Sequence, residues 1–247
     1  MRLDGRIALV TGASSGIGRA IAIAFAEAGA DVAINYRDNE RGAHEVASEI
    51  EKLGRRAMPV RADVTHPREV EDMVELVTGA WQRLDVLVNN AGVVRRGSLF
   101  EIDAAMWDDV VDVNLKGAFL CAQSAARWML PSGRGAIVNI ASMRGVEGGS
   151  TSMHYAAAKG GLITLTKSLA RELAPAIRVN AVAPGYVETR IQADLTPEKR
   201  REIIASTPLK RIGLPEEIAR VALFFASDAS SYVTGQTLLA DGGRVMT

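Results

Sequence analysis

The stretch Thr11-Gly12-Ala13-Ser14-Ser15-Gly16-Ile17-Gly18 lies between a short apolar run and an alanine-rich pattern with helical spacing. A strand, a glycine turn and a helix in this order can hold a pyrophosphate, because glycine lets a ligand approach the main chain and the helix begins with unpaired N–H groups. The spacing is Gly-x-x-x-Gly-x-Gly, so a tight strand-to-helix turn remains an alternative. We predict a dinucleotide site that includes Gly12, Ser14, Ser15, Gly16, Ile17 and Gly18.

On both sides of this stretch, short β-branched runs alternate with longer helical patterns. This alternation is typical of a parallel sheet that helices cover on both faces, so we predict one doubly wound α/β domain with seven parallel strands. Residues 186–213 interrupt the alternation, which fits either a mobile lid over a substrate cleft or a solvated helical excursion. The expected strands span residues 6–11, 31–36, 57–62, 86–90, 136–141, 178–182 and 237–240, and the expected helices span 17–29, 40–53, 67–82, 103–130, 152–174 and 215–226.

The composition excludes several classes of partner. The chain of 247 residues carries 29 Lys and Arg against 29 Asp and Glu, which argues against a surface for nucleic acid or anionic lipid and favours a small molecule. Apolar residues form short runs, and the first ten residues lead directly into a strand pattern, so we expect no membrane segment and a cytoplasmic protein. Cys121 is the only cysteine, and His44, His66 and His154 lack ligand spacing, so we expect no disulfide and no transition metal.

The end of the second expected strand bears on the choice of cofactor. In doubly wound folds the residue that contacts the adenosine ribose lies there, and this chain has Arg37 at that place. A guanidinium favours the 2′-phosphate of NADP(H), whereas an acid favours NAD(H). We predict NADP(H), with NAD(H) possible because Asp38 follows directly. Asp63 and Val64 are expected beside the adenine, although a helix cap and a core residue would look the same.

Three side chains predict proton transfer. Ser142 ends the fifth expected strand, and Tyr155 and Lys159 lie four residues apart on one face of a helix. A phenol has a pKa of about 10, and a nearby ammonium lowers it. We therefore predict that Tyr155 exchanges a proton with the oxygen of a carbonyl or alcohol, that Lys159 tunes it, and that Ser142 holds the same oxygen. A helix cap, a half-buried aromatic residue and a solvated charge are the alternatives for these residues taken singly.

With these motifs in order, the chain resembles the short-chain dehydrogenase/reductase family over essentially its whole length, and most of all its 3-oxoacyl-acyl-carrier-protein reductases. The further motifs are Asn89-Asn90-Ala91-Gly92, Asn180-Ala181-Val182-Ala183-Pro184-Gly185, Glu188-Thr189 and Ala226-Ser227-Asp228. The resemblance implies that Lys159 bonds the nicotinamide ribose, that Asn114 holds a water chain, and that the protein is a homotetramer. The remaining residues expected at the cofactor are Asn90, Ala91, Gly92, Pro184, Gly185, Val187 and Thr189.

The sequence leaves the substrate open. The expected cleft walls are mostly apolar, which suits an acyl chain, a steroid or a terpenoid, and a reductase acting on acyl-carrier protein needs a basic docking patch. The stretch Ala174-Pro175-Ala176-Ile177 is shorter and less basic than expected of carrier-protein reductases. A 3-oxoacyl thioester is therefore the first hypothesis, an NAD(P)-dependent dehydrogenase of a sugar, polyol or steroid alcohol the second, and a nucleotide-binding sensor without turnover the third. The expected walls are Val93, Val94, Met143, Val146, Met153, Tyr186 and Val187, and the expected patch is Arg95, Arg96, Arg127 and Arg134.

Overall fold

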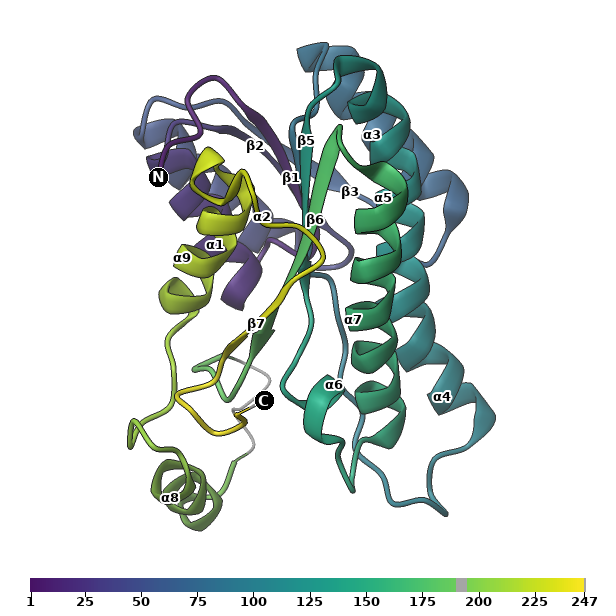
Figure 1. Cartoon of the computed structure of the whole chain (residues 1–247), viewed down its shortest axis with the longest axis vertical. Coiled ribbons are helices and arrows are strands. Elements are labelled where there is room, and N and C mark those ends of the chain that lie inside the picture. The colour runs from purple at the N-terminus through teal and green to yellow at the C-terminus, as the bar shows by residue number, and fades with distance from the viewer. Residues whose placement is uncertain (190–194, 247) are drawn as a thin grey trace.

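One seven-stranded parallel sheet forms the centre of the molecule (Figure 1). The computed structural model describes residues 1–189 and 195–246. The strands lie in the order β3-β2-β1-β4-β5-β6-β7, and every neighbouring pair is parallel, as the sequence predicts. They are β1 (Ile7–Val10), β2 (Asp31–Tyr36), β3 (Ala57–Arg61), β4 (Val86–Asn89), β5 (Gly135–Ile140), β6 (Ile177–Pro184) and β7 (Thr237–Ala240).

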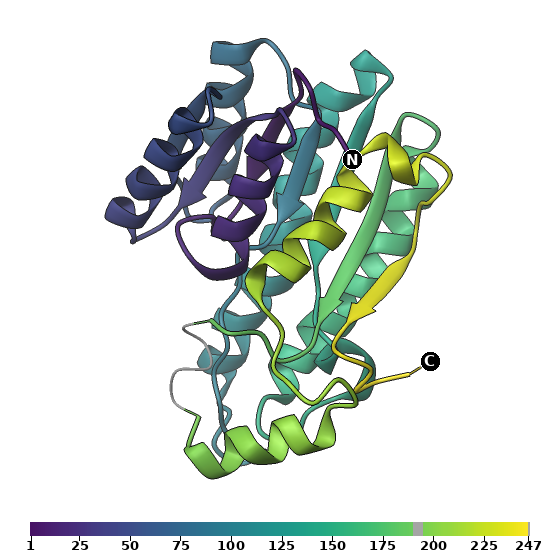
Figure 2. The same cartoon turned by 90° about the vertical axis from the view of Figure 1, so that its left-hand side faces the viewer.

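Helices cover both faces of this sheet, and Figure 2 shows one of the two layers from its outer side. Helices α1, α2 and α9 pack on one face, and α3, α4, α5 and α7 lie on the other. The bounds are α1 (Gly16–Glu27), α2 (Glu40–Lys52), α3 (Pro67–Trp81), α4 (Ala104–Val111), α5 (Gly117–Met129), α6 (Arg144–Glu147), α7 (Met153–Leu173), α8 (Pro197–Ser206) and α9 (Pro215–Ala226).

Strand β1 shows why the sheet needs both layers. Ala8 and Val10 pack into the core beneath α1, α2 and α9, whereas Ile7 and Leu9 pack into the core on the opposite face. Successive side chains of a strand point to opposite faces, so an unbroken apolar run is buried on both. The strand order reverses between β1 and β4, and open α/β sheets bind ligands at the carboxyl ends of such strands.

Some elements differ from the sequence prediction. The expected helix over residues 103–130 is α4 and α5 joined by a π-helical stretch, Asp112–Lys116, and β6 extends on both sides of 178–182. Helix α8 lies within the segment 186–213, of which residues 190–194 are outside the described part of the chain, so the lid stays a prediction. Helix α6 was not predicted because it has a single turn. Among the described residues, no helix is long and apolar enough to cross a membrane.

Candidate active site

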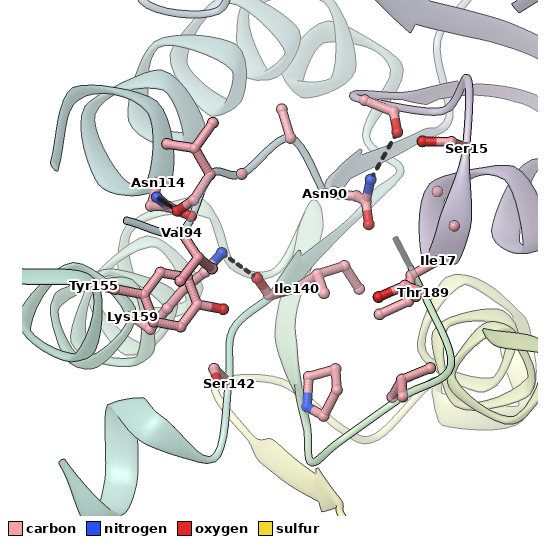
Figure 3. Close-up of a pocket in the computed structure, with 18 of the residues that line it drawn as sticks. Ser15, Ile17, Asn90, Val94, Asn114, Ile140, Ser142, Tyr155, Lys159 and Thr189 are labelled. Atoms are coloured by element: carbon pink, nitrogen blue, oxygen red, sulfur yellow. Dashed lines mark hydrogen bonds between the residues drawn. The ribbon is translucent and has the colours of Figure 1, made fainter. Parts of the chain in front are cut away.

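A cavity of about 750 Å³ opens at the carboxyl ends of the strands. Every residue that the sequence predicts for the cofactor or for catalysis lines it (Figure 3 shows part of it). These residues are Gly12, Ser14, Ser15, Gly16, Ile17, Gly18, Arg37, Asp63, Val64, Asn90, Ala91, Gly92, Asn114, Ser142, Tyr155, Lys159, Pro184, Gly185, Val187 and Thr189.

The glycine loop is fixed to the end of β4. The Thr11 hydroxyl accepts hydrogen bonds of 3.0 Å from the backbone N–H groups of Asn90 and Ala91, and the Asn90 side chain donates to the Thr11 and Gly12 carbonyls. Gly12 has a φ of +61°, and a Cβ at this position would lie 2.9 Å from the Ala91 Cα. Only glycine fits here, because both the backbone conformation and the close approach exclude a side chain.

The start of α1 matches the chemistry of a pyrophosphate. Ser15 is the N-cap, its side chain makes no capping hydrogen bond, and the first turn contains no acidic residue. A Cβ on Gly18 would lie 2.4 Å from both Asn90 Nδ2 and the Gly12 carbonyl oxygen, so helix and loop pack without a gap. Main-chain donors and a positive helix end therefore line the cavity next to the Ser14 and Ser15 hydroxyls, as an anionic ligand requires.

Charged groups gather at the end of β2. Arg37 Nε donates to Asp38 Oδ2 at 2.7 Å, and Arg37 Nη1 lies 3.7 Å from Asp63 Oδ2. Burial raises the pKa of Asp63, but the hydrogen bonds from Thr65 and the charge of Arg37 outweigh it and lower the pKa. Arg61 Nε donates to the Arg37 carbonyl. Arg61 lines a second hollow next to the cavity, together with Arg37, Asp38 and Asp63. The end of the cavity that is expected to hold the adenosine is therefore lined by the guanidinium group of Arg37 and by the carboxylates of Asp38 and Asp63.

Tyr155 faces the cavity from α7, next to Ser142 at the end of β5 (Figure 3). Burial raises the pKa of Tyr155, while a hydrogen bond with Ser142 and the positive charge of Arg144 work in the opposite direction. The Ser142 hydroxyl also accepts the Arg144 backbone N–H at 3.2 Å, so it helps to start α6 as well. Two hydroxyl groups able to bond one carbonyl oxygen therefore lie side by side.

Lys159 is buried one helical turn beyond Tyr155, and only 3% of its surface is exposed. Its Nζ donates to the Ile140 carbonyl at 2.7 Å and lies 5.8 Å from the centre of the Tyr155 ring. Burial lowers the pKa of Lys159 to about 7. Charged and neutral lysine therefore coexist near neutral pH, and the expected tuning of Tyr155 by Lys159 stays a prediction.

Asn114 belongs to the π-helical stretch and is also buried. Its Nδ2 donates to the carbonyls of Val93, at 2.8 Å, and Val110, at 2.9 Å. Its Oδ1 is buried without a hydrogen-bond partner among the described residues. A Cβ on Gly92 would lie 2.7 Å from this oxygen and 3.6 Å from Lys159 Nζ, so the amide oxygen and the lysine share the space over Gly92. An unpaired buried acceptor beside an ammonium is a place where a water molecule fits.

The substrate end of the cavity is less apolar than the sequence suggested. Val93, Val94, Met143, Tyr186 and Val187 line it as expected. The remaining two expected walls, Val146 and Met153, lie outside the lining, whereas polar groups complete it. These polar groups are Arg96, Arg144, Ser150, Thr151, Ser152, Lys199 and Arg244.

The expected basic docking patch does not form as predicted. Arg127 lies 3.5 Å from Glu71, and Arg95 lies 3.2 Å from Asp109. Arg134 precedes β5, so it lies at the amino ends of the strands, opposite the cavity, where it pairs with Asp228. Of the four arginines only Arg96 lines the cavity. Arg127 lies within α5, Arg134 lies before the amino end of β5, and Arg95 pairs with Asp109.

Sequence reasoning missed several residues of the site. Asn35 is fully enclosed, accepts the Gly12 N–H at 3.1 Å and donates to the Ala62 carbonyl at 3.0 Å, so it joins β2 and β3 to the glycine loop. Arg144 follows Ser142 by two residues, and this short distance was a usable signal. Arg244 is separated from the motifs by a long stretch of chain, and the sequence contains no pattern that would place it here.

Comparisons with known proteins show the family of this chain. A family model described as enoyl-(acyl carrier protein) reductase matches residues 12–244. The 3-oxoacyl-acyl-carrier-protein reductase of Thermotoga maritima is 45% identical over 248 residues, which cover 100% of both chains. The reductase of the same name from Staphylococcus aureus is 44% identical over 97% of this chain and 98% of its own length. A short-chain type dehydrogenase/reductase from Mycobacterium marinum superposes with a TM-score of 0.95 at 40% identity, covering 100% of this chain and 98% of its own. This chain therefore belongs to the short-chain dehydrogenase/reductase family and is an oxidoreductase that acts on CH–OH groups with a nicotinamide cofactor.

Proposed function

We propose that this protein uses NADPH to reduce the 3-oxo group of a 3-oxoacyl thioester to a 3-hydroxyl group. The observation that carries the proposal is the meeting of Tyr155, Ser142 and Lys159 with the glycine loop in one cavity. The substrate class is supported by relatives that are 44–45% identical over nearly the full chain and are named 3-oxoacyl-acyl-carrier-protein reductases. A carrier protein or a smaller thioester would present the same reacting group.

The bound nicotinamide supplies the hydride that adds to the carbonyl carbon. The Tyr155 hydroxyl donates its proton to the carbonyl oxygen as negative charge develops there, which completes the alcohol. Ser142 donates a hydrogen bond to the same oxygen and holds the carbonyl in register. Protonated Lys159 stabilises the phenolate that remains and bonds the ribose hydroxyls. In the reverse direction the phenolate takes the proton.

Asn114 and Lys159 together hold the water that returns a proton to Tyr155. The unpaired Asn114 Oδ1, next to Lys159 Nζ across Gly92, supports this role. The amide cannot turn freely, because its Nδ2 is bonded to two carbonyls. The oxygen therefore stays directed at the position that a water molecule needs.

NADP(H) is the proposed cofactor because Arg37 lines the cavity at the end of β2 and Arg61 lies beside it. Guanidinium groups bind phosphate through paired hydrogen bonds. The carboxylate of Asp38, which bonds Arg37 at 2.7 Å, is the feature that would favour NAD(H). Steady-state kinetics with both cofactors separates the two.

A second candidate is oxidation of a sugar or polyol. The hydroxyl groups of Ser150, Thr151 and Ser152, which line the substrate end, favour it. Steady-state assays of acetoacetyl thioesters and of a panel of alcohols, each with both cofactors, test the proposal. A thioester kcat/KM at least tenfold above that of every alcohol is expected. A sugar or polyol that exceeds the thioesters would replace the first candidate with the second.

We further propose a homotetramer in the cytoplasm. Exposed aromatic side chains support the assembly: Trp107 on α4 is 41% exposed and Phe119 on α5 is 40% exposed. Large apolar side chains that are exposed in one chain are covered when subunits pack against each other. Both residues lie on the helical layer formed by residues 103–130 and 152–174, which family resemblance places between subunits. Light scattering measures the mass directly.

A further inference from the structure

The charged residues at the substrate end of the cavity are cations. Apart from Lys159, they are Arg96, Arg144, Lys199 and Arg244, and within the described part of the chain no carboxylate lines this end. The acids of the cavity, Asp38 and Asp63, lie at its other end, beyond the glycine loop. A substrate that reaches the reacting tyrosine therefore enters a region of positive potential.

Of these four cations, Arg144 is the one whose charge lowers the pKa of Tyr155. Its Nη2 donates to the Tyr186 hydroxyl at 2.9 Å, and its Nη1 lies 2.9 Å from Glu147 Oε1. These partners hold the guanidinium beside the cavity. The Arg144 side chain is 32% exposed. Its charge also acts on Tyr155, where it counters the effect of burial on the pKa of the phenol. The arginine is thus positioned within electrostatic reach of the reacting oxygen.

Arg244 also contacts Tyr186. Its guanidinium carbon lies 5.1 Å from the centre of the Tyr186 ring, and its Nη1 donates to Ser206 Oγ at 2.6 Å. Glu147 and Glu202 pair with Arg144 and with Lys199. The charge of Arg244 also helps to lower the pKa of Glu202, but among the described residues Arg244 forms no ion pair within 4.0 Å. The cluster of Arg144, Tyr186 and Arg244 therefore carries an excess of positive charge.

We propose that this cluster binds an anionic oxygen group of the substrate, so that the enzyme selects carbonyl compounds that carry a carboxylate or a phosphate. The inference rests on the proposed function, because it assigns the group that this cavity recognises next to the reacting carbonyl. Guanidinium groups that are already held in place bind such oxygens with little loss of side-chain entropy. A carboxylate adjoining the ketone would contact Arg144, and a phosphate at the far end of a thioester arm would contact Arg244.

Two pairs of substrates with the same ketone test the proposal. Acetoacetate and methyl acetoacetate differ in the carboxylate, and S-acetoacetyl-4′-phosphopantetheine and S-acetoacetyl-pantetheine differ in one phosphate. With NADPH we expect the anionic member of at least one pair to have a kcat/KM about 10- to 100-fold higher, mainly through KM. The carboxylate pair reports on Arg144 and the phosphate pair on Arg244.

Matched variants assign the preference to the cluster. Arg144→Gln is expected to remove a preference for acetoacetate, and Arg244→Gln a preference for the 4′-phosphopantetheine thioester. Arg95→Gln removes the same charge from a nearby arginine that pairs with Asp109 outside the cavity lining, so it should leave both preferences unchanged.

Equal kcat/KM values within both pairs would overturn the inference, as would variants that slow charged and neutral substrates alike. The proposed function would survive either result, since the neutral ketones would still be reduced. Failure of the proposed function has its own signature, because neither member of the thioester pair would then be reduced with NADPH.

Discussion

Lys159 on α7 donates a 2.7 Å hydrogen bond to the main-chain carbonyl of Ile140 at the end of β5 (Figure 3). This bond crosses from the helical layer to the sheet and fixes the lysine beneath the Tyr155 ring. Burial removes water from the ammonium, and the hydrogen bond to the Ile140 carbonyl replaces only part of that hydration. Burial lowers its pKa to about 7 for that reason.

The buried lysine should make stability depend on pH. The folded-state pKa lies below the unfolded value of 10.5, so the unfolded chain binds more protons between pH 7 and 10.5, and the free energy of unfolding rises across this range. Relative to Lys159→Met, the cofactor-free wild type should gain up to about 4 kcal/mol from pH 7 to 10. Urea unfolding of both proteins at several pH values measures the difference. A difference that stays constant with pH would contradict the lowered pKa.

Removal of the Tyr155 hydroxyl should stop turnover without disturbing the fold. Tyr155→Phe keeps the ring and loses the proton donor, so kcat should fall by at least about 100-fold. Thermal unfolding and cofactor binding should change little. Tyr232→Phe, at a fully exposed tyrosine, is the matched control and should keep its rate. A normal rate in Tyr155→Phe would refute the catalytic assignment.

Ser142→Ala should shift the pH profile of alcohol oxidation. The phenolate is the base in this direction, so the rate rises with pH until Tyr155 is deprotonated. The hydrogen bond with Ser142 lowers the pKa of Tyr155, and its loss should move the midpoint of the rise to higher pH. Ser168→Ala, at an exposed position on α7, the helix that carries Tyr155, should leave the midpoint in place. An unmoved midpoint in Ser142→Ala would show that the serine does not act on the phenol.

Gly12→Ala should damage cofactor binding beyond the strain of its backbone. Gly12 and Gly54 both have positive φ values, +61° and +74°. A Cβ at Gly12 would collide with Ala91, whereas a Cβ at Gly54 would have no atom within 4 Å. Gly54→Ala should therefore cost about 1 kcal/mol of stability and leave cofactor affinity unchanged. Gly12→Ala should cost more and weaken NADPH binding at least tenfold, as titration calorimetry would measure. Equal effects of the two substitutions would argue against a phosphate-binding loop.

Arg37→Gln should change the choice of cofactor. If Arg37 meets the 2′-phosphate, kcat/KM for NADPH should fall about 10- to 100-fold, and the value for NADH should change little. Arg41→Gln alters an exposed arginine on α2 that pairs with Glu45, so it should affect neither value. Parallel losses for NADPH and NADH would assign Arg37 to the fold of the loop.

Local patterns in the sequence were sufficient for the sheet and for the phosphate loop. Apolar runs such as Ile7–Val10 can only be buried on both faces, and Gly12 with Gly16 marks a turn before a helix. Both are short-range requirements of backbone and burial, so neighbouring residues reveal them. Tyr155 and Lys159 were found for the same reason, since their spacing places them on one face of α7.

Tertiary structure decided which charged groups reach the cavity. Arg134 was predicted as a docking residue. It precedes β5, however, and pairs with Asp228 at the amino ends of the strands, opposite the cavity. No sequence pattern links Arg144 with Arg244, which are far apart in the chain. Both nevertheless contact Tyr186 in the folded protein. A charged side chain is tolerated on any exposed position, so its partner depends on where distant elements end. The sequence alone therefore determines the cofactor fold and the tyrosine that is proposed to react, and the folded chain determines which groups line the rest of the cavity.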